Sequence, residues 1–154
     1  MKTLKVILVL GLILGLATAA YAAQTLRIST IAAVNGTVEV KIAGGAWMPA
    51  QVGMTLQQGD LIRTMEASSA TVNLDGNGET AMVRVKENSQ MMIAQLVQDI
   101  EAATQSTLLD LALGSVLITA KELHSEKSSF EVKTPTSIVG VRGTTFDVTV
   151  EAIE

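Results

Sequence analysis

Apolar residues recur at every second position through most of the chain that follows Leu26, and this alternation limits the folds that the chain can adopt. A spacing of two places side chains on one face of a pleated strand, so the sequence predicts a fold built mainly from β-strands. In the first such segment, Leu26, Ile28 and Thr30 alternate with Arg27 and Ser29. We expect Arg27 to face water, as charged residues in alternating strands usually do.

Turn-forming residues separate these strands at intervals of about 8–12 residues. Gly44-Gly45 predicts a two-residue hairpin turn, and segment 75–78, which reads Asp-Gly-Asn-Gly, predicts a second hairpin. Short strands with this spacing are typical of a sandwich, a barrel or a short solenoid. The pattern does not choose among these three all-β architectures.

Segment 91–107 fits two patterns. The i, i+3, i+4, i+7 spacing of one helix face is present and favours a short helix, with apolar residues at Ile93, Leu96, Val97 and Ile100. Met91 and Ile93 also alternate, which favours a strand that leads into a polar loop. Both interpretations remain open for this segment.

The next apolar segments predict two strands on either side of a tight turn at Gly114. The first strand would cover residues 109–113 and the second residues 116–118. The polar run 121–129 predicts a loop, and region 130–150 has the strongest β propensity of the chain.

The first 22 residues have the features of a secretory leader. Lys2 and Lys5 precede an apolar stretch over 6–16, and segment 20–22, Ala-Tyr-Ala, is typical of a cleavage site. The stretch is shorter than the roughly 20 apolar residues of a membrane-spanning helix. We therefore expect a signal-peptide helix over 1–22 and one domain over 23–154, exported to the periplasm or secreted, with an uncleaved N-terminal anchor as the minor alternative.

The composition argues against nucleic-acid binding. Cleavage would remove two lysines, so the net charge of −4 becomes −4 − 2 = −6. Proteins that bind nucleic acid use clustered basic residues and often interleaved aromatic ones, whereas aromatic residues make up 3% of this chain. The chain contains no Cys, so its stability depends on packing and on the hydrogen bonds of the sheet.

We predict no catalytic site, cofactor or metal. His124 is the single histidine of the sequence, and no nucleophile-elbow pattern surrounds a serine. Oxygen-bearing residues at 73, 75 and 77 resemble the start of a calcium loop, but the position of its bidentate acid is occupied by Arg84. A hairpin turn explains the same residues.

Segment 134–148 reads Thr-Pro-Thr-Ser-Ile-Val-Gly-Val-Arg-Gly-Thr-Thr-Phe-Asp-Val and resembles the signature of the FecR family. Features upstream of this segment match the family in the same order, and they extend the resemblance over about residues 30–150. They are Val34-x-Gly36-x-Val38, Trp47, Pro49-Ala50, Gly53, Gly59-Asp60, Ile62-Arg63-Thr64, Ser69-Ala70, Leu74-Asp75-Gly76 and Leu113-Gly114-Ser115-Val116.

The resemblance implies a compact, twisted, solenoid-like or sandwich-like β domain outside the cytoplasm, with no catalytic activity. In regulators of this family the domain belongs to a periplasmic portion that receives a signal from an outer-membrane receptor. No cytoplasmic segment precedes the leader here, and the chain ends at Glu154, soon after the motif. We therefore expect a stand-alone binding or signal-relay module for a protein or envelope partner. The alternative is a structural protein that self-assembles through open β edges.

The family motif is expected to serve the fold, through Thr134, Pro135, Gly140, Val141, Arg142, Gly143, Thr144 and Phe146. Gly140 and Gly143 would permit a close backbone approach or a bulge within a strand. Arg142 would be a partly buried cation, satisfied by carbonyls or by Asp60 or Asp147. Trp47 is expected to cover one end of the core, and Trp47 and Arg142 are the candidate residues of a partner surface.

Overall fold

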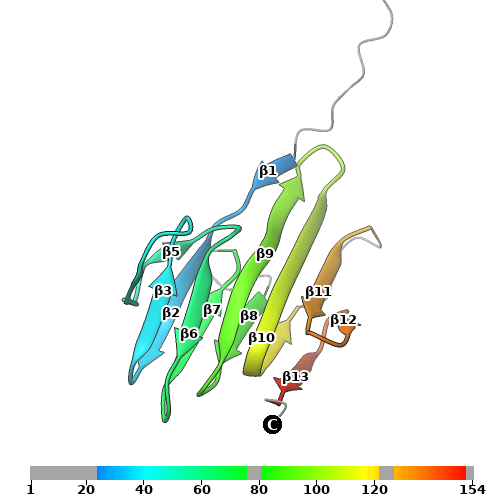
Figure 1. Ribbon diagram of the computed structural model, residues 1–154. Helices are drawn as coiled ribbons and strands as arrows, with labels where there is room; N and C mark the ends of the chain where they lie inside the picture. Colours follow the sequence, from blue (N-terminus) through cyan, green and yellow to red (C-terminus); the bar gives the residue numbers. More distant parts are fainter. Residues whose placement is uncertain (1–23, 76–80, 122–126, 152–154) are drawn as a thin grey trace, which may run out of the picture.

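The computed structural model describes residues 24–75, 81–121 and 127–151, which form thirteen β-strands and no helix (Figure 1). The prediction of an all-β protein is confirmed for this part of the chain. The predicted leader, with its helix, lies outside the described residues. Within the same three ranges there is no helix long and apolar enough to span a membrane.

The strands are joined into one sheet that curls into a half-barrel, with the main path β4-β3-β6-β9-β10-β8-β7-β2-β5 (Figure 1). Their bounds are β1 Gln24–Leu26, β2 Ser29–Asn35, β3 Val38–Lys41, β4 Trp47–Pro49, β5 Thr55–Leu56, β6 Leu61–Thr64, β7 Ser69–Asn73, β8 Ala81–Val85, β9 Gln90–Asp99, β10 Thr104–Ala120, β11 Ser129–Lys133, β12 Ile138–Gly140 and β13 Thr145–Val150.

The curl gives the sheet two layers that face each other. The front layer contains β3, β6, β9 and the first half of β10, and the back layer contains β2, β7, β8 and the second half of β10 (Figure 1). At one border β11 pairs in parallel with β10 and carries β12, while β13 pairs antiparallel with the second half of β10.

Apolar side chains from both layers form one continuous core. The fully buried large residues come from the strands of both layers and the segments beside them, namely Ile31, Val40, Leu56, Ile62, Val72, Leu74, Met91, Ile93, Leu96, Leu109, Leu111 and Ile118. Burying one such side chain contributes about 1.5–3 kcal/mol, so the packed faces of the two layers are the main source of stability.

Strand β10 belongs to both layers. Its residues 104–113 pair with β9, and its residues 116–120 pair with β8. The change of layer occurs at Gly114, whose φ of +88° is in the region that favours glycine. The prediction of two separate strands about this glycine is therefore wrong, because residues 104–120 form one strand: its ladder with β9 ends at Leu113 and its ladder with β13 begins at Gly114.

The chain crosses between the layers at four corners that are stacked on one another, and we call this stack the corner column. Its corners are residues 35–37, 64–68, 86–89 and 113–115. Backbone hydrogen bonds connect neighbouring corners: Met65 N–H donates to Thr37 O at 3.1 Å, and Asn88 N–H donates to Met65 O at 3.2 Å. Lys86 N–H donates to Ser115 O at 2.9 Å and completes the column.

Two corners are held by the same glycine–serine device. Gly36 lies on Ser68, whose Oγ accepts a hydrogen bond from Thr37 N–H at 2.8 Å. Gly114 lies on Ser89, whose Oγ accepts one from Ser115 N–H at 2.8 Å. In each case the serine hydroxyl also donates at 3.0 Å to the carbonyl of a glutamate two residues earlier.

Segment 91–107 contains strand rather than helix. It runs from β9 through a turn into β10, and Ile93 and Leu96 are buried whereas Ile100 is exposed. The register of β9 against β10 shifts near Ala94, where one residue of β9 bulges out of the ladder. The bulge changes the burial spacing from two to three, and this explains the helix-like pattern.

Two hairpins are confirmed, and one differs in detail. The turn between β3 and β4 has positive φ at Ala43 and Gly44, with Gly45 N–H donating to Ile42 O at 2.9 Å. Its centre is one residue earlier than the predicted Gly44-Gly45. Strands β7 and β8 pair antiparallel as predicted, and most of the turn between them, like His124, lies outside the described residues.

The prediction for the first alternating segment is wrong. Arg27 and Ser29 are buried, whereas Leu26 and Ile28 are 64% and 49% exposed. The Arg27 guanidinium donates to Leu74 O and to Thr107 Oγ1, each at 3.2 Å. These hydrogen bonds compensate for the burial of the charge.

Candidate functional site

The family motif begins with a polar turn that joins β11 to β12. Thr134 N–H donates to Ser137 O at 2.8 Å, and Ser137 N–H donates to Thr134 Oγ1 at 3.0 Å. Pro135 lies within this turn, where its fixed φ and missing N–H are tolerated. Thr134 and Pro135 therefore lie in a hydrogen-bonded turn, and their structural role stays a prediction.

The glycines of the motif lie outside a strand interior. Gly140 ends β12, and no atom lies within 4 Å of the place that an added Cβ would take, so no close approach requires this glycine. Val141 is buried, and Gly143, with φ +59°, lies in the link that carries the chain from the front layer to β13 in the back layer. The prediction of a bulge inside one continuous strand is wrong, because residues 141–144 separate two strands.

Arg142 is exposed on this link, and the prediction of a partly buried cation is wrong. The burial of the cation is the part of the prediction that fails, and hydrogen bonds hold both acids that were suggested as its partners. Asp60 accepts from the backbone N–H groups of Ala43 and Gln57, each at 2.8 Å, and Asp147 forms an ion pair with Lys86. Accessibility leaves Arg142 suited to the surface role that was the second interpretation of this residue.

Trp47 lies on the outer face of the front layer, at the opposite border of the sheet from β13. The guanidinium carbon of Arg63 is 4.1 Å from the centroid of its ring, and Arg63 Nη2 is 2.7 Å from Glu39 Oε2. Stacking on Arg63 replaces the predicted packing over one end of the core. The structure does not bring Trp47 and Arg142 together into one surface.

Strand β13 presents an edge of six residues. Among the described residues it pairs with β10 alone. Ala120 N–H donates to Thr144 O at 3.2 Å. Thr144 and every second residue after it therefore direct their backbone groups toward β10. The backbone groups of Thr145, Asp147 and Thr149 therefore point away from β10, where another strand could bind them.

A hollow of about 390 Å³ lies beside the C-terminal end of this edge. It separates β13 from the turn of the family motif, and its apolar lining comes from Leu113, Pro135 and Val150, with Glu151 at its margin. Leu113 is 40% exposed. The edge and the hollow together form what we call the β13 site.

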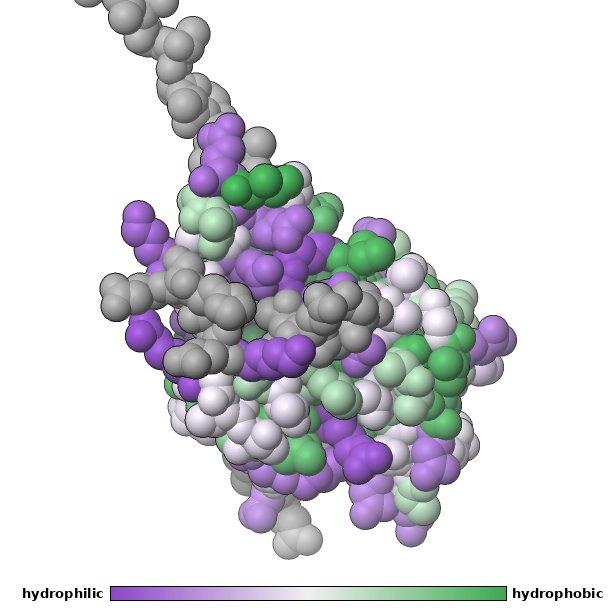
Figure 2. All heavy atoms as spheres, turned by 180° about the vertical axis from the view of Figure 1, so that it is seen from behind, coloured by the Kyte–Doolittle hydropathy of each residue, from purple (hydrophilic) through white to green (hydrophobic). Residues whose placement is uncertain are grey.

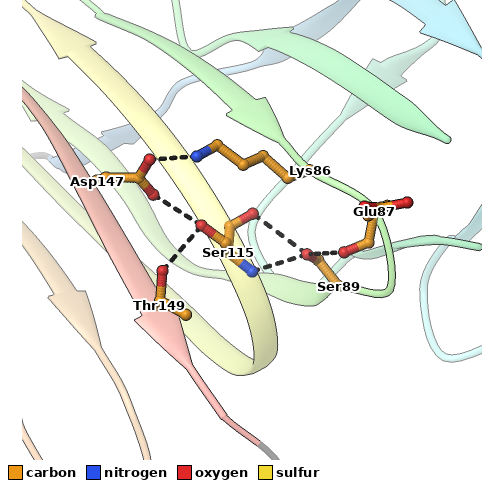
Figure 3. A network of polar contacts seen from close by, with 6 residues as sticks. All are labelled: Lys86, Glu87, Ser89, Ser115, Asp147 and Thr149. Carbon is orange, nitrogen blue, oxygen red and sulfur yellow. Dashed lines mark hydrogen bonds and ion pairs between the residues drawn. The ribbon is translucent and has the colours of Figure 1, made fainter. Parts of the chain in front are cut away.

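A polar network fixes the outer side of this edge (Figure 3). Lys86 contacts Asp147 Oδ2, Ser115 Oγ donates to Asp147 Oδ1 at 2.7 Å, and Thr149 Oγ1 donates to Ser115 Oγ at 3.0 Å. Through Ser115 N–H and Ser89 Oγ, the network continues into the corner column. The edge strand is thus attached by hydrogen bonds to the corner column.

The network also lowers the pKa of Asp147. The hydrogen bonds from Lys86 and Ser115 favour the carboxylate and hold its pKa below the ordinary value of 3.8, while partial burial acts weakly in the opposite direction. A carboxyl whose pKa is lowered by folding stabilises the fold above its unfolded-state pKa. That contribution is lost as the pH falls through the folded-state pKa.

We expect Asp147→Asn to lower the free energy of unfolding at pH 7 by less than about 1 kcal/mol, because the pair is exposed and screened. The difference from the native protein should begin to shrink below about pH 4, where the carboxyl of the unfolded chain takes up a proton, and should vanish below the folded-state pKa. Urea unfolding at pH 7 and at lower pH measures it. A difference that stays constant over this range would show that the charge of Asp147 is not the cause.

The described residues contain no group of three or more His, Cys, Asp or Glu side chains placed to hold a metal ion. What they define is an all-β module with an accessible strand edge. A family model described as FecR protein matches residues 60–153, which is 153 − 60 + 1 = 94 of the 154 residues. The chain belongs to the FecR family, and the family relates it to signal transduction.

The matched region begins at Asp60, so the upstream features over 34–59 lie outside it. Comparison with curated proteins and with solved structures gave no significant match.

The serines of the corner column and the burial of Arg27 were not predicted from the sequence. A signal for the serines is present, since segments 66–68 and 87–89 both read Glu-x-Ser, and segments 36–38 and 114–116 read Gly-Thr-Val and Gly-Ser-Val. The burial of Arg27 has no comparable signal, because the residue lies in a pattern that is typical of an exposed cation.

Proposed function

We propose that the protein is an exported, non-enzymatic binding and signal-relay module that engages a protein or envelope partner through β13. The observation that carries the proposal is the edge of β13, on which three residues direct both backbone groups outward. Pairing with an exposed edge is a common way for a domain to bind an extended segment, because main-chain hydrogen bonds provide the affinity.

The outer face of the back layer is less suited to bind a partner than the edge of β13. The rear of the fold carries hydrophilic residues interspersed with small groups of hydrophobic ones (Figure 2). The outward side chains of its strands include Thr71, Arg84 and Thr119. Met82, on the same side of β8 as Arg84, is 42% exposed, so the face is mixed. It offers a partner scattered apolar groups, whereas the edge offers directional hydrogen bonds.

Self-assembly through the same edge is the competing function, and charge disfavours it. In the symmetric antiparallel pairing that uses all three outward residues, Asp147 would lie opposite a second Asp147, and like charges directly opposite each other are destabilising. The predicted mature charge of −6 adds repulsion between copies. A different protein is therefore the better occupant.

Export is part of the proposal and depends on the leader over 1–22. Cell fractionation followed by N-terminal sequencing tests it, and we expect a mature chain that starts after Ala22. An intact Met1 on a membrane-bound species would support the anchored alternative.

A photo-reactive amino acid at position 145, on the edge, tests the binding role inside the cell. We expect a specific cross-linked protein from this position and none from position 52, since Val52 is 64% exposed between β4 and β5 at the other border. Mass spectrometry identifies the product, and light scattering of the purified protein separates a partner from a second copy. Equal products from both positions, or none from position 145, would contradict the proposal.

A further inference from the structure

We propose that the partner segment bound at β13 is extended, has apolar residues at every second position, and places a lysine or arginine beside Asp147. This inference rests on the proposed function and adds the chemistry of the ligand. Its three parts come from the backbone, the inner side and the outer side of the β13 site.

The backbone of β13 requires an extended ligand. The outward N–H and C=O groups of Thr145, Asp147 and Thr149 recur at every second residue, which is the spacing of a ladder and not of a helix. A segment of about six residues covers them, since each residue of a strand advances about 3.3 Å.

The inner side of the site requires apolar residues at alternate positions. Val148 is buried, while Phe146 and Val150 on either side of it are half-buried against the core. A strand added beside β13 would continue the back layer, and its inward side chains would cover Phe146 and Val150. One of them would enter the hollow between Leu113 and Pro135.

The outer side of the site favours a cation. The Asp147 side chain is 41% exposed, and its two oxygens contact Lys86 and Ser115 while retaining capacity for a further hydrogen bond. Glu151 is exposed at the end of the same edge. A residue of the ligand directly opposite Asp147 has its side chain on this same outer face, so a lysine or arginine there is favoured.

A synthetic peptide provides the test, with NMR chemical-shift titration of the purified protein as the measurement. The probe is a capped seven-residue peptide in which valine and threonine alternate and the central outward position is lysine. We expect saturable shifts of the Thr145, Asp147 and Thr149 amides. Changing the lysine to glutamate should weaken binding by about two- to fivefold, and a scrambled peptide of the same composition should not bind at this edge.

A matched pair of protein variants shows whether the backbone is responsible. Thr149→Pro removes one outward N–H at a position where an edge strand tolerates proline, and we expect at least about tenfold weaker binding. Thr149→Ala loses the hydroxyl and its hydrogen bond to Ser115 but keeps the N–H, so it should weaken binding much less than Thr149→Pro does. Thermal melting confirms that both variants fold.

The two proposals fail in different ways. A cross-link from position 145 that Thr149→Pro abolishes, together with no peptide binding or with equal binding of the scrambled peptide, would overturn the inferred ligand and leave the proposed function standing. Equal binding by Thr149→Pro and Thr149→Ala would overturn the edge as the site, and with it both proposals.

Discussion

Replacing Gly114 with alanine should lower the free energy of unfolding by about 3 kcal/mol or more, a large part of the roughly 5–15 kcal/mol typical of a small domain. An added Cβ would lie 2.2 Å from Ser89 Oγ, 2.5 Å from Ser89 Cα and 2.6 Å from Asn88 O. Two of these atoms are backbone and cannot move without disturbing the corner column. Denaturant unfolding of the purified variant measures the loss.

Gly53→Ala is the matched control. Gly53 has φ +87°, close to the +88° of Gly114, but no atom lies within 4 Å of an added Cβ. Its substitution should lower the free energy of unfolding by only about 1 kcal/mol, the usual effect of a positive φ at alanine. If the two variants lost the same stability, backbone conformation and not the contact with Ser89 would explain the role of Gly114.

Replacing Arg27 with methionine should lower the free energy of unfolding by about 2–4 kcal/mol. The change removes a charged donor from Leu74 O and a partner from the buried Thr107 hydroxyl. Burial lowers the pKa of Arg27, and the nearby Asp75 carboxylate opposes that effect and favours the charged form. Methionine keeps the apolar stem and provides none of these interactions.

Arg84→Met serves as the control for this prediction, because Arg84 is exposed on the outer face of β8. Its effect should stay within about 0.5 kcal/mol. Thermal and denaturant unfolding of both variants give the comparison. A loss of less than about 1 kcal/mol for Arg27→Met would show that its hydrogen bonds do not offset the cost of burying the charge.

The strands of the fold were predictable because alternation is a local property. Wherever one face of a strand meets the core, as in β3, β7 and β8, burial alternates with the sequence. The hairpin of β7 and β8 and the identity of the family motif could also be predicted. Each depends on residues that are adjacent in the chain.

The failures arise where distant segments decide the outcome. A bulge at Ala94 shifts the phase of β9, and nothing in the local sequence marks it. Arg27 is buried because Leu74 and Thr107, distant in sequence, supply its acceptors. Arg142 is exposed because the chain leaves one layer and enters the other beside it, although it lies within an apolar segment.

The candidate site could be predicted only in part. The motif residues identified the correct region of the chain, but the edge of β13 depends on which strand remains unpaired on one side. That property follows from the pairing order of the whole sheet. No single residue of segment 145–150 indicates that this strand is unpaired on one side.

The corner column follows the order of the chain. Corners 35–37, 64–68, 86–89 and 113–115 are neighbours in space in the same order as in sequence, so each bent pair of strands rests mainly on the pair synthesised before it. A polypeptide that is synthesised from its N-terminus can add one such layer after another, without waiting for its last residues. The final strand to arrive is β13, and until then its place beside β10 is vacant.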